Sequence, residues 1–138
     1  MASNEIELRW LSGERFDIQQ NGKTLPIDGN SDAAKSEGFK PKALILSSLA
    51  GCTAIDVVEI LNKMRVPFTE FSIKTIGDLT EDYPKVYHTV HLVYLIRLQN
   101  SEDKDKMERA VQLSQEKYCG VSAMVRKFAD LQIKIEYL

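Results

Sequence analysis

The stretch Pro41–Pro67, PKALILSSLAGCTAIDVVEILNKMRVP, decides the fold, and it carries Cys52, the first of two cysteines. On a helix with about 100 degrees per residue, its apolar side chains occupy all sides rather than one stripe. They both flank Cys52 and lie opposite it, as Ile45, Leu46, Leu49, Ala50, Ile55 and Val57 do. Since a helix that is apolar all round is a buried helix, we predict a core helix that carries a thiol.

Prolines delimit this helix, because proline is tolerated in a first turn and stops a helix at its far end. We therefore expect roughly 24 helical residues between Pro41 and Pro67. The weakly polar run from Ala43 to Ile55 falls short of the roughly 20 apolar residues that a membrane span needs. The helix becomes polar from Glu59 to Arg65, so only its half around Cys52 must be enclosed by other parts of the protein.

Upstream of the helix the sequence predicts a three-stranded meander. Residues 5–11 and 14–20 alternate apolar and polar side chains, as half-buried strands do. Asn21-Gly22 is a strong hairpin signal and leads into a third short strand at 23–27. Residues 28–40 are rich in Gly, Ser, Asp and Asn and are expected to form a loop, one whose length is often functional.

Downstream, residues 68–76 and 85–98 are expected to be strands, followed by a helix that starts at Ser101. The buried face of that helix is predicted to hold Met107, Ala110, Val111, Ser114 and Tyr118. Cys119 lies at a joint to a further helix, and residues 131–138 alternate as a closing strand. This element order, with antiparallel hairpins dominant, predicts an α+β fold.

The composition limits the expected number of domains, the partners and the location of the protein. With 138 residues, 43% apolar and 28% charged, the chain is expected to form one globular domain over residues 1–138. A net charge of -2 with interspersed signs gives no support for nucleic acid or a membrane surface as partner. The N-terminal residues show no secretory segment, so a cytoplasmic, reducing location is expected, in which the cysteines are free thiols or a transient redox pair.

The two cysteines carry the candidate chemistry. A buried cysteine by itself is more often a small hydrophobe, but a second thiol at a helix N-terminus favours a peroxidatic and resolving pair, Cys52 and Cys119. Asp56, one turn beyond Cys52, opposes a thiolate unless a cation neutralises it. It can instead hold an arginine, for which the candidates are Arg15, Arg97 and Arg126.

Metal and cofactor motifs are absent from the sequence. His88 and His91 lie three positions apart on a predicted strand and so point to opposite faces. Without CxxC or HxxxH spacing we expect no metal site, and without GxGxxG, GxxxxGK or GxSxG we expect no nucleotide cofactor and no serine hydrolase chemistry.

The segments LSSLAGCTAIDVVEIL, LRWLSGERF, LPIDGN and LSQEKYCGVSAM resemble the OsmC/Ohr superfamily of thiol peroxidases, most closely its uncharacterised OsmC-like redox proteins. The resemblance covers essentially the whole chain. It implies an intertwined homodimer in which antiparallel sheets wrap around long central helices, with active sites at the subunit boundary. It also implies organic hydroperoxides as substrate, a peroxidatic Cys52, a resolving Cys119, and a dithiol such as a lipoyl group as reductant.

The chain departs from this family at the start of the central helix. Members with peroxidase activity carry a glutamate in a Pro-x-Glu-Leu pattern, together with an arginine that it orients towards the thiol. Here the segment is Pro41-Lys42-Ala43-Leu44, so alanine replaces the glutamate, and Lys40 or Lys42 is the alternative source of positive charge. This departure motivates two further hypotheses, a non-catalytic protein that binds a small apolar ligand at the dimer boundary and an interaction module whose cysteines merely pack.

Overall fold

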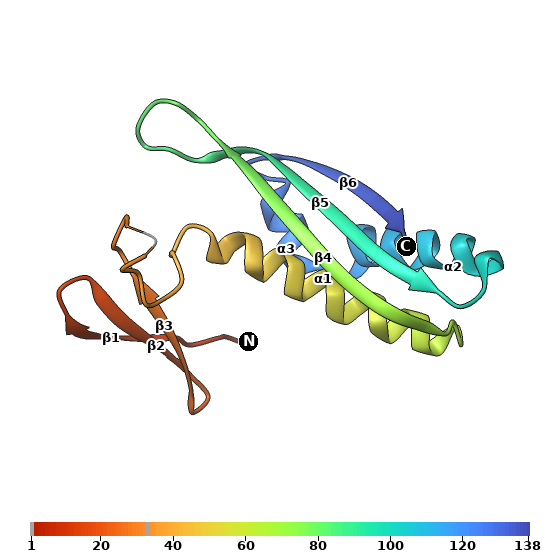
Figure 1. Ribbon diagram of the computed structural model, residues 1–138, viewed down its shortest axis with the longest axis horizontal. Coiled ribbons are helices and arrows are strands. Elements are labelled where there is room, and N and C mark those ends of the chain that lie inside the picture. Colours follow the sequence, from red (N-terminus) through yellow and green to blue (C-terminus); the bar gives the residue numbers. More distant parts are fainter. Residues whose placement is uncertain (1, 33) are drawn as a thin grey trace. The chain divides into compact units, whose positions relative to one another are not determined.

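The computed structural model describes residues 2–32 and 34–138. The chain divides into two compact units, Met1–Ile45 and Leu46–Leu138, whose elements are labelled in Figure 1. The single domain expected over residues 1–138 stays a prediction.

The first unit is the predicted meander. Strands β1 (Glu7–Ser12), β2 (Arg15–Gln20) and β3 (Lys23–Asp28) pair antiparallel in the order β1-β2-β3. The turn between β2 and β3 is the predicted Asn21-Gly22, where both residues have positive φ, 48° and 75°. Such a turn suits the twist of a hairpin, and asparagine and glycine tolerate this conformation best.

Few side chains of the first unit are buried. Every residue of β1 is exposed, including Trp10 at 64%. Within the described part of residues 1–45, Asp28 is the one residue classed as buried. The sheet therefore has no apolar core of its own within the single chain.

The second unit holds two long strands and the helices. Its elements are α1 (Leu44–Lys63, which starts at the end of the first unit), β4 (Phe68–Leu79), β5 (Tyr87–Leu98), η1 (Ser101–Asp103), α2 (Lys104–Leu113), η2 (Ser114–Tyr118), α3 (Gly120–Val125) and β6 (Asp130–Tyr137). The predicted α+β class is confirmed.

One detail of the predicted sheets is wrong. β4 and β5 form the expected antiparallel hairpin, but β6 pairs parallel to β5, from Thr89↔Asp130 to Ile96↔Tyr137. A parallel neighbour needs a crossover of a dozen or more residues, and the helical segment between β5 and β6 supplies it. The sheet, in the order β4-β5-β6, is therefore mixed.

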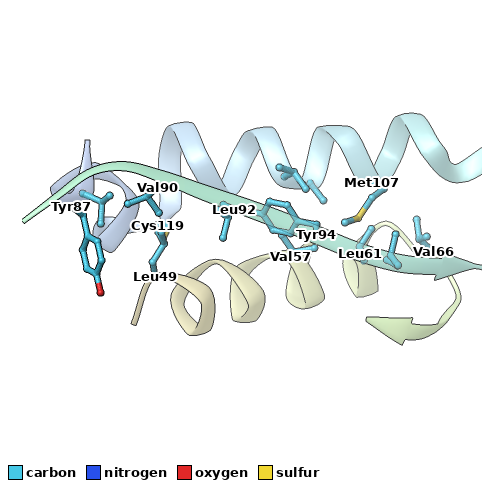
Figure 2. Packing of buried hydrophobic residues seen from close by; sticks show 14 residues of the cluster. Leu49, Val57, Leu61, Val66, Tyr87, Val90, Leu92, Tyr94, Met107 and Cys119 are labelled. Carbon is cyan, nitrogen blue, oxygen red and sulfur yellow. The ribbon is translucent and has the colours of Figure 1, made fainter. Parts of the chain in front are cut away.

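The core of the second unit lies between this sheet and the helices (Figure 2). From Val90 to Ile96, alternate residues of β5 are buried, as the period of a strand dictates. They pack in one cluster with side chains of α1 and α2, and its buried members from these elements are Leu49, Val57, Leu61, Tyr87, Val90, Leu92, Tyr94, Ile96, Met107, Ala110 and Val111. Burial of each large aliphatic side chain contributes about 1.5–3 kcal/mol.

The central helix α1 differs from its prediction. It has 20 residues, and its buried residues are Leu49, Thr53, Val57 and Leu61, a single stripe with a spacing of four. Ile55 is 63% exposed, so within one chain the helix is not buried on all sides. By length and composition alone, with a mean hydropathy of 1.9, it meets the requirement for a membrane span, contrary to the sequence estimate. Its buried stripe nevertheless packs in the core, as predicted for a core helix.

The predicted buried face of the second helix is correct up to Ser114 and wrong at Tyr118. Met107, Ala110, Val111 and Ser114 are buried, whereas Tyr118 is 53% exposed. Ser114–Tyr118 is a π-helical turn, which has more residues per turn than an α-helix. The helical spacing therefore no longer holds at Tyr118.

Candidate thiol site

The two cysteines occupy different local structures. Cys52 lies within α1 and is half-buried, and Cys119 follows the π-helical turn and is buried. Cys119 caps α3, and its Sγ accepts a hydrogen bond from the Ser122 N–H at 3.3 Å. Its predicted place at a helix joint is confirmed.

The fold brings the cysteines together. One ligand atom from each of Cys52, Asp56 and Cys119 lies within 4.8 Å of the other two. Asp56 follows Cys52 by four residues, which places both on the same side of α1. Neither cysteine forms a disulfide, and a bond of about 2.03–2.05 Å requires the sulfurs to move closer.

The surroundings of Cys52 favour the protonated form of its thiol. Burial raises the pKa of Cys52 above its ordinary value, and a hydrogen bond from the Val121 backbone acts in the opposite direction. The neighbouring Cys119 and the charge of Asp56 raise this pKa further. The expectation that Asp56 opposes a Cys52 thiolate is therefore confirmed.

A buried hydroxyl network, made of Thr53, Tyr94, Ser114 and Gln115, connects Asp56 to the core. The Oγ1 of Thr53 is 2.6 Å from the Tyr94 hydroxyl and 2.7 Å from the Ser114 Oγ. The Ser114 hydroxyl donates to Asp56 Oδ2 at 2.9 Å, and Gln115 Nε2 donates to the Tyr94 hydroxyl at 2.8 Å. Asp56 is thus held by a network whose four members are all buried.

Arg126 extends the network from α3 to the π-helical turn. Its guanidinium donates to the backbone carbonyl of Gln115 at 2.9 Å and to the Gln115 side-chain oxygen at 3.0 Å. π-Helical turns are frequent at functional sites, and this one immediately precedes Cys119. Arg126 therefore orders the segment that positions the second thiol.

The three arginines considered as partners of Asp56 all bind elsewhere. Arg15 pairs with Glu37 at 2.8 Å, Arg97 pairs with Glu70 at 3.4 Å, and Arg126 contacts Gln115. Across residues 2–32 and 34–138, no ion pair within 4.0 Å involves Asp56. Within the second unit, the prediction is therefore wrong for Arg97 and Arg126, whereas Arg15, which lies in the first unit, stays a prediction.

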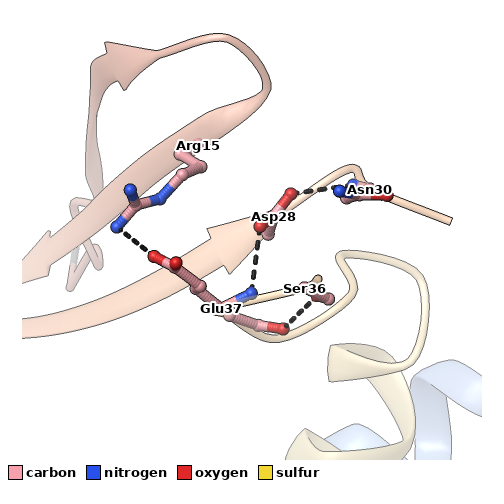
Figure 3. Close-up of polar contacts among 6 residues, drawn as sticks. Arg15, Asp28, Asn30, Ser36 and Glu37 are labelled. Carbon is pink, nitrogen blue, oxygen red and sulfur yellow. Dashed lines mark hydrogen bonds and ion pairs between the residues drawn. The ribbon is translucent and has the colours of Figure 1, made fainter. Parts of the chain in front are cut away.

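A second polar cluster lies in the first unit (Figure 3). Asp28 accepts hydrogen bonds from the Asn30 and Glu37 backbone N–H groups at 2.8 and 3.0 Å. The Glu37 bond, followed by the Asn30 bond, lowers the pKa of Asp28. The Lys40 ammonium donates to the carbonyls of Asp28 and Asn30. Lys40 thus contributes to this loop, and positive charge near Cys52 from Lys40 or Lys42 stays a prediction.

A groove of about 320 Å³ adjoins the thiol site, since Asp56 lines it. Ile60, Met64, Leu113 and Tyr118 supply its apolar surface, and Glu59 and Lys63 supply further charge. Such a groove suits a ligand with an apolar body.

Sequence reasoning identified both thiols and the proximity of Asp56 to Cys52, but it missed the hydroxyl network. The available signals were Thr53 within the apolar helix and Ser114 on the predicted buried face, because a buried hydroxyl needs a hydrogen-bond partner. Tyr94 and Gln115 gave no comparable signal.

The comparisons agree with this architecture. The family model described as OsmC-like protein matches residues 33–134. Protein YhfA of Escherichia coli (strain K12) is 32% identical over 129 residues, which cover 92% of each chain. The crystal structure of a hypothetical protein from Aquifex aeolicus VF5 has a TM-score of 0.86 and 29% identity, covering 100% of this chain and 98% of that one. The organic hydroperoxide resistance protein OhrB of Bacillus subtilis, at 17% identity and a TM-score of 0.66, shares the fold and covers 98% of each chain.

Proposed function

The chain belongs to the OsmC-like protein family, and we propose from this premise that it reduces organic hydroperoxides with the thiols of Cys52 and Cys119. The observation that carries the proposal is the convergence of the two thiol sulfurs to within 4.8 Å. A protein with the same fold is named for organic hydroperoxide resistance, which supports the choice of substrate.

The proposed reaction has three steps. The Cys52 thiolate attacks the peroxide oxygen remote from the organic group, the O–O bond breaks, and the alkoxide takes a proton to leave as an alcohol. The resulting sulfenic acid condenses with the Cys119 thiol to form a disulfide and release water. A dithiol, such as a lipoyl group, returns both cysteines to thiols and is itself oxidised.

The groove beside Asp56 supports a substrate with an apolar organic group. Its apolar lining of Ile60, Met64, Leu113 and Tyr118 is suited to such a group. Because burial and Asp56 raise the pKa of Cys52, the reaction is expected to accelerate as the pH rises and the thiolate forms.

The protein is proposed to act as a cytoplasmic homodimer with the site at the subunit boundary. Apolar side chains left exposed in the single chain support a second copy, among them Leu8, Trp10 and Ile55. Large exposed apolar patches commonly mark interaction sites.

A stoichiometric peroxide reaction tests the function. Reduced protein is mixed with cumene hydroperoxide and its thiols are counted by mass spectrometry. We expect a Cys52–Cys119 disulfide in the unmodified protein and a Cys52 sulfenic acid in Cys119→Ser. A protein that keeps both thiols and forms neither product, even at alkaline pH, contradicts the proposal.

A non-catalytic function is the second candidate, favoured by the raised pKa of Cys52 together with the apolar groove. In this case the protein binds a small apolar ligand at the dimer boundary. Cys52→Ser separates the two functions, because it abolishes peroxide reduction but leaves binding of an apolar fluorescent probe unchanged.

A further inference from the structure

We propose that Cys52, Asp56 and Cys119 form a zinc-binding site with two sulfur ligands, one oxygen ligand and a fourth position open to water. This proposal goes beyond peroxide reduction and does not require it. It also revises the expectation of no metal site, because the third ligand was not recognised in the sequence.

The geometry of the three side chains fits a tetrahedral ion. Zinc binds cysteine sulfur at about 2.3 Å and carboxylate oxygen at about 2.0–2.2 Å, so two sulfurs on one tetrahedral zinc lie about 3.8 Å apart. The ligand atoms of Cys52, Asp56 and Cys119 already converge to within 4.8 Å. Side-chain rotations that bring the sulfurs from at most 4.8 Å to about 3.8 Å apart are therefore sufficient for coordination.

The residues around Asp56 orient its carboxylate by hydrogen bonds, as the residues around metal ligands do. Ligating carboxylates are themselves hydrogen-bonded, and such outer partners fix their orientation. Ser114 donates to Asp56 Oδ2 at 2.9 Å, and Thr53 in turn lies 2.7 Å from the Ser114 Oγ. Because Ser114 and Thr53 are fully buried, this support is part of the core rather than a surface contact.

Charge also favours a cation. In the zinc-bound form, two thiolates and one carboxylate bring three negative charges to one place, and no ion pair of Asp56 is found in residues 2–32 and 34–138. A divalent ion offsets most of this charge. Cys52 is only half-buried, which leaves access for water as the fourth ligand, the arrangement of zinc sites with an open position.

Binding exchanges protons and involves no electron transfer. Zinc binds the thiolates, so the two thiol protons pass to solvent as the two zinc–sulfur bonds form. Since the same sulfurs form the proposed disulfide, zinc-bound protein is expected to resist oxidation by peroxide. Zinc and peroxide therefore compete for one pair of thiols.

The test is a zinc titration of the reduced, unmodified protein without oxygen, in competition with a chromophoric chelator. We expect one zinc ion per chain. Cys52→Ser and Cys119→Ser should each weaken binding more than 100-fold, and Asp56→Asn should weaken it at least tenfold. The matched control is Glu59→Gln, which removes an exposed carboxylate of the same helix outside the cluster and should leave affinity unchanged.

Cobalt(II) provides a measurement that needs no variant. Cobalt bound to the unmodified protein should show tetrahedral ligand-field bands and a thiolate-to-cobalt charge-transfer band. Absence of the charge-transfer band, or an Asp56→Asn protein that folds and binds zinc as tightly as the unmodified one, overturns the site. Zinc binding is measured without peroxide. A failed zinc titration therefore leaves the proposed peroxide reduction standing, and a failed peroxide reaction leaves the proposed zinc site standing.

Discussion

Strands β2 and β5 both place successive side chains on opposite faces, yet the two strands differ in how far one face is buried. In β5, alternate side chains are buried from Val90 to Ile96, because α1 and α2 contribute to the same core. In β2, no residue is fully buried. Alternation therefore predicts which side chains share a face, but burial of that face depends on what covers it.

The two units are also stabilised differently. The second unit has an apolar core and a buried hydroxyl network, whereas the first has backbone hydrogen bonds to Asp28 and an exposed ion pair, Arg15–Glu37. Exposed ion pairs contribute little, about 0–1 kcal/mol. Substitutions of similar chemistry in the two units should consequently have unequal effects.

The largest difference is expected for leucine truncation. Leu92→Ala, in the core of the second unit, should lower the free energy of unfolding by about 2–5 kcal/mol. Leu8→Ala, on the exposed strand β1, should change it by less than about 0.5 kcal/mol at dilutions where the chain is monomeric. Chemical denaturation measures both. Equal losses at high dilution would contradict the contrast between the units.

Removal of a buried hydroxyl should have the next largest effect. Ser114→Ala removes the hydroxyl that donates to Asp56 Oδ2 and one of the hydrogen-bond partners of Thr53, and it is expected to cost about 1–3 kcal/mol. Thr24→Ala, an exposed hydroxyl on β3, should be nearly neutral. Thermal unfolding with a chelator present compares them, and a neutral Ser114→Ala would show that the network does not stabilise the unit.

The loop of the first unit should loosen in acid. The pKa of Asp28 is lowered in the folded chain, so the stability that it contributes is present above the unfolded value and is lost as pH falls through the folded value. Pepsin should cut the loop at 34–40 faster below about pH 4. Asp28→Asn should abolish this pH dependence, and Asp17→Asn on β2 should keep it. A loop equally resistant at all these pH values sinks the prediction.

The smallest expected effect is on the reactivity of Cys52. Its pKa is raised, so the associated stability is present below the unfolded pKa and declines as pH rises through the folded one. Alkylation of Cys52 by iodoacetamide, followed by mass spectrometry, should show a midpoint above the ordinary value. Asp56→Asn should move that midpoint downward, whereas Glu59→Gln should not. A midpoint at or below the ordinary value would contradict the effect of burial.

Local elements were predictable because their signals are local. The strands of the meander, the Asn21-Gly22 turn and the helix after Ser101 all agree with the structure to within a few residues. The two thiols were also identified from the sequence. Their meeting was a hypothesis, because the residues between them neither require nor forbid it.

Four features could not be predicted from local patterns. The parallel pairing of β6 depends on how the helical crossover returns to the sheet. The outward position of Tyr118 depends on a π-helical turn, which interrupts the regular spacing. The exposed side of α1 depends on what covers it, and the hydroxyl network joins residues far apart in the chain.

By itself, the sequence determined most of the elements, the α+β class and the two candidate thiols, since periodicity, turn residues and thiols are properties of short segments. Only the tertiary structure decided that Cys119 lies against Cys52 and Asp56, and that buried hydroxyls hold the carboxylate in place. The reason is physical. Contacts between distant segments arise from packing of the whole core, which no short stretch of the chain encodes.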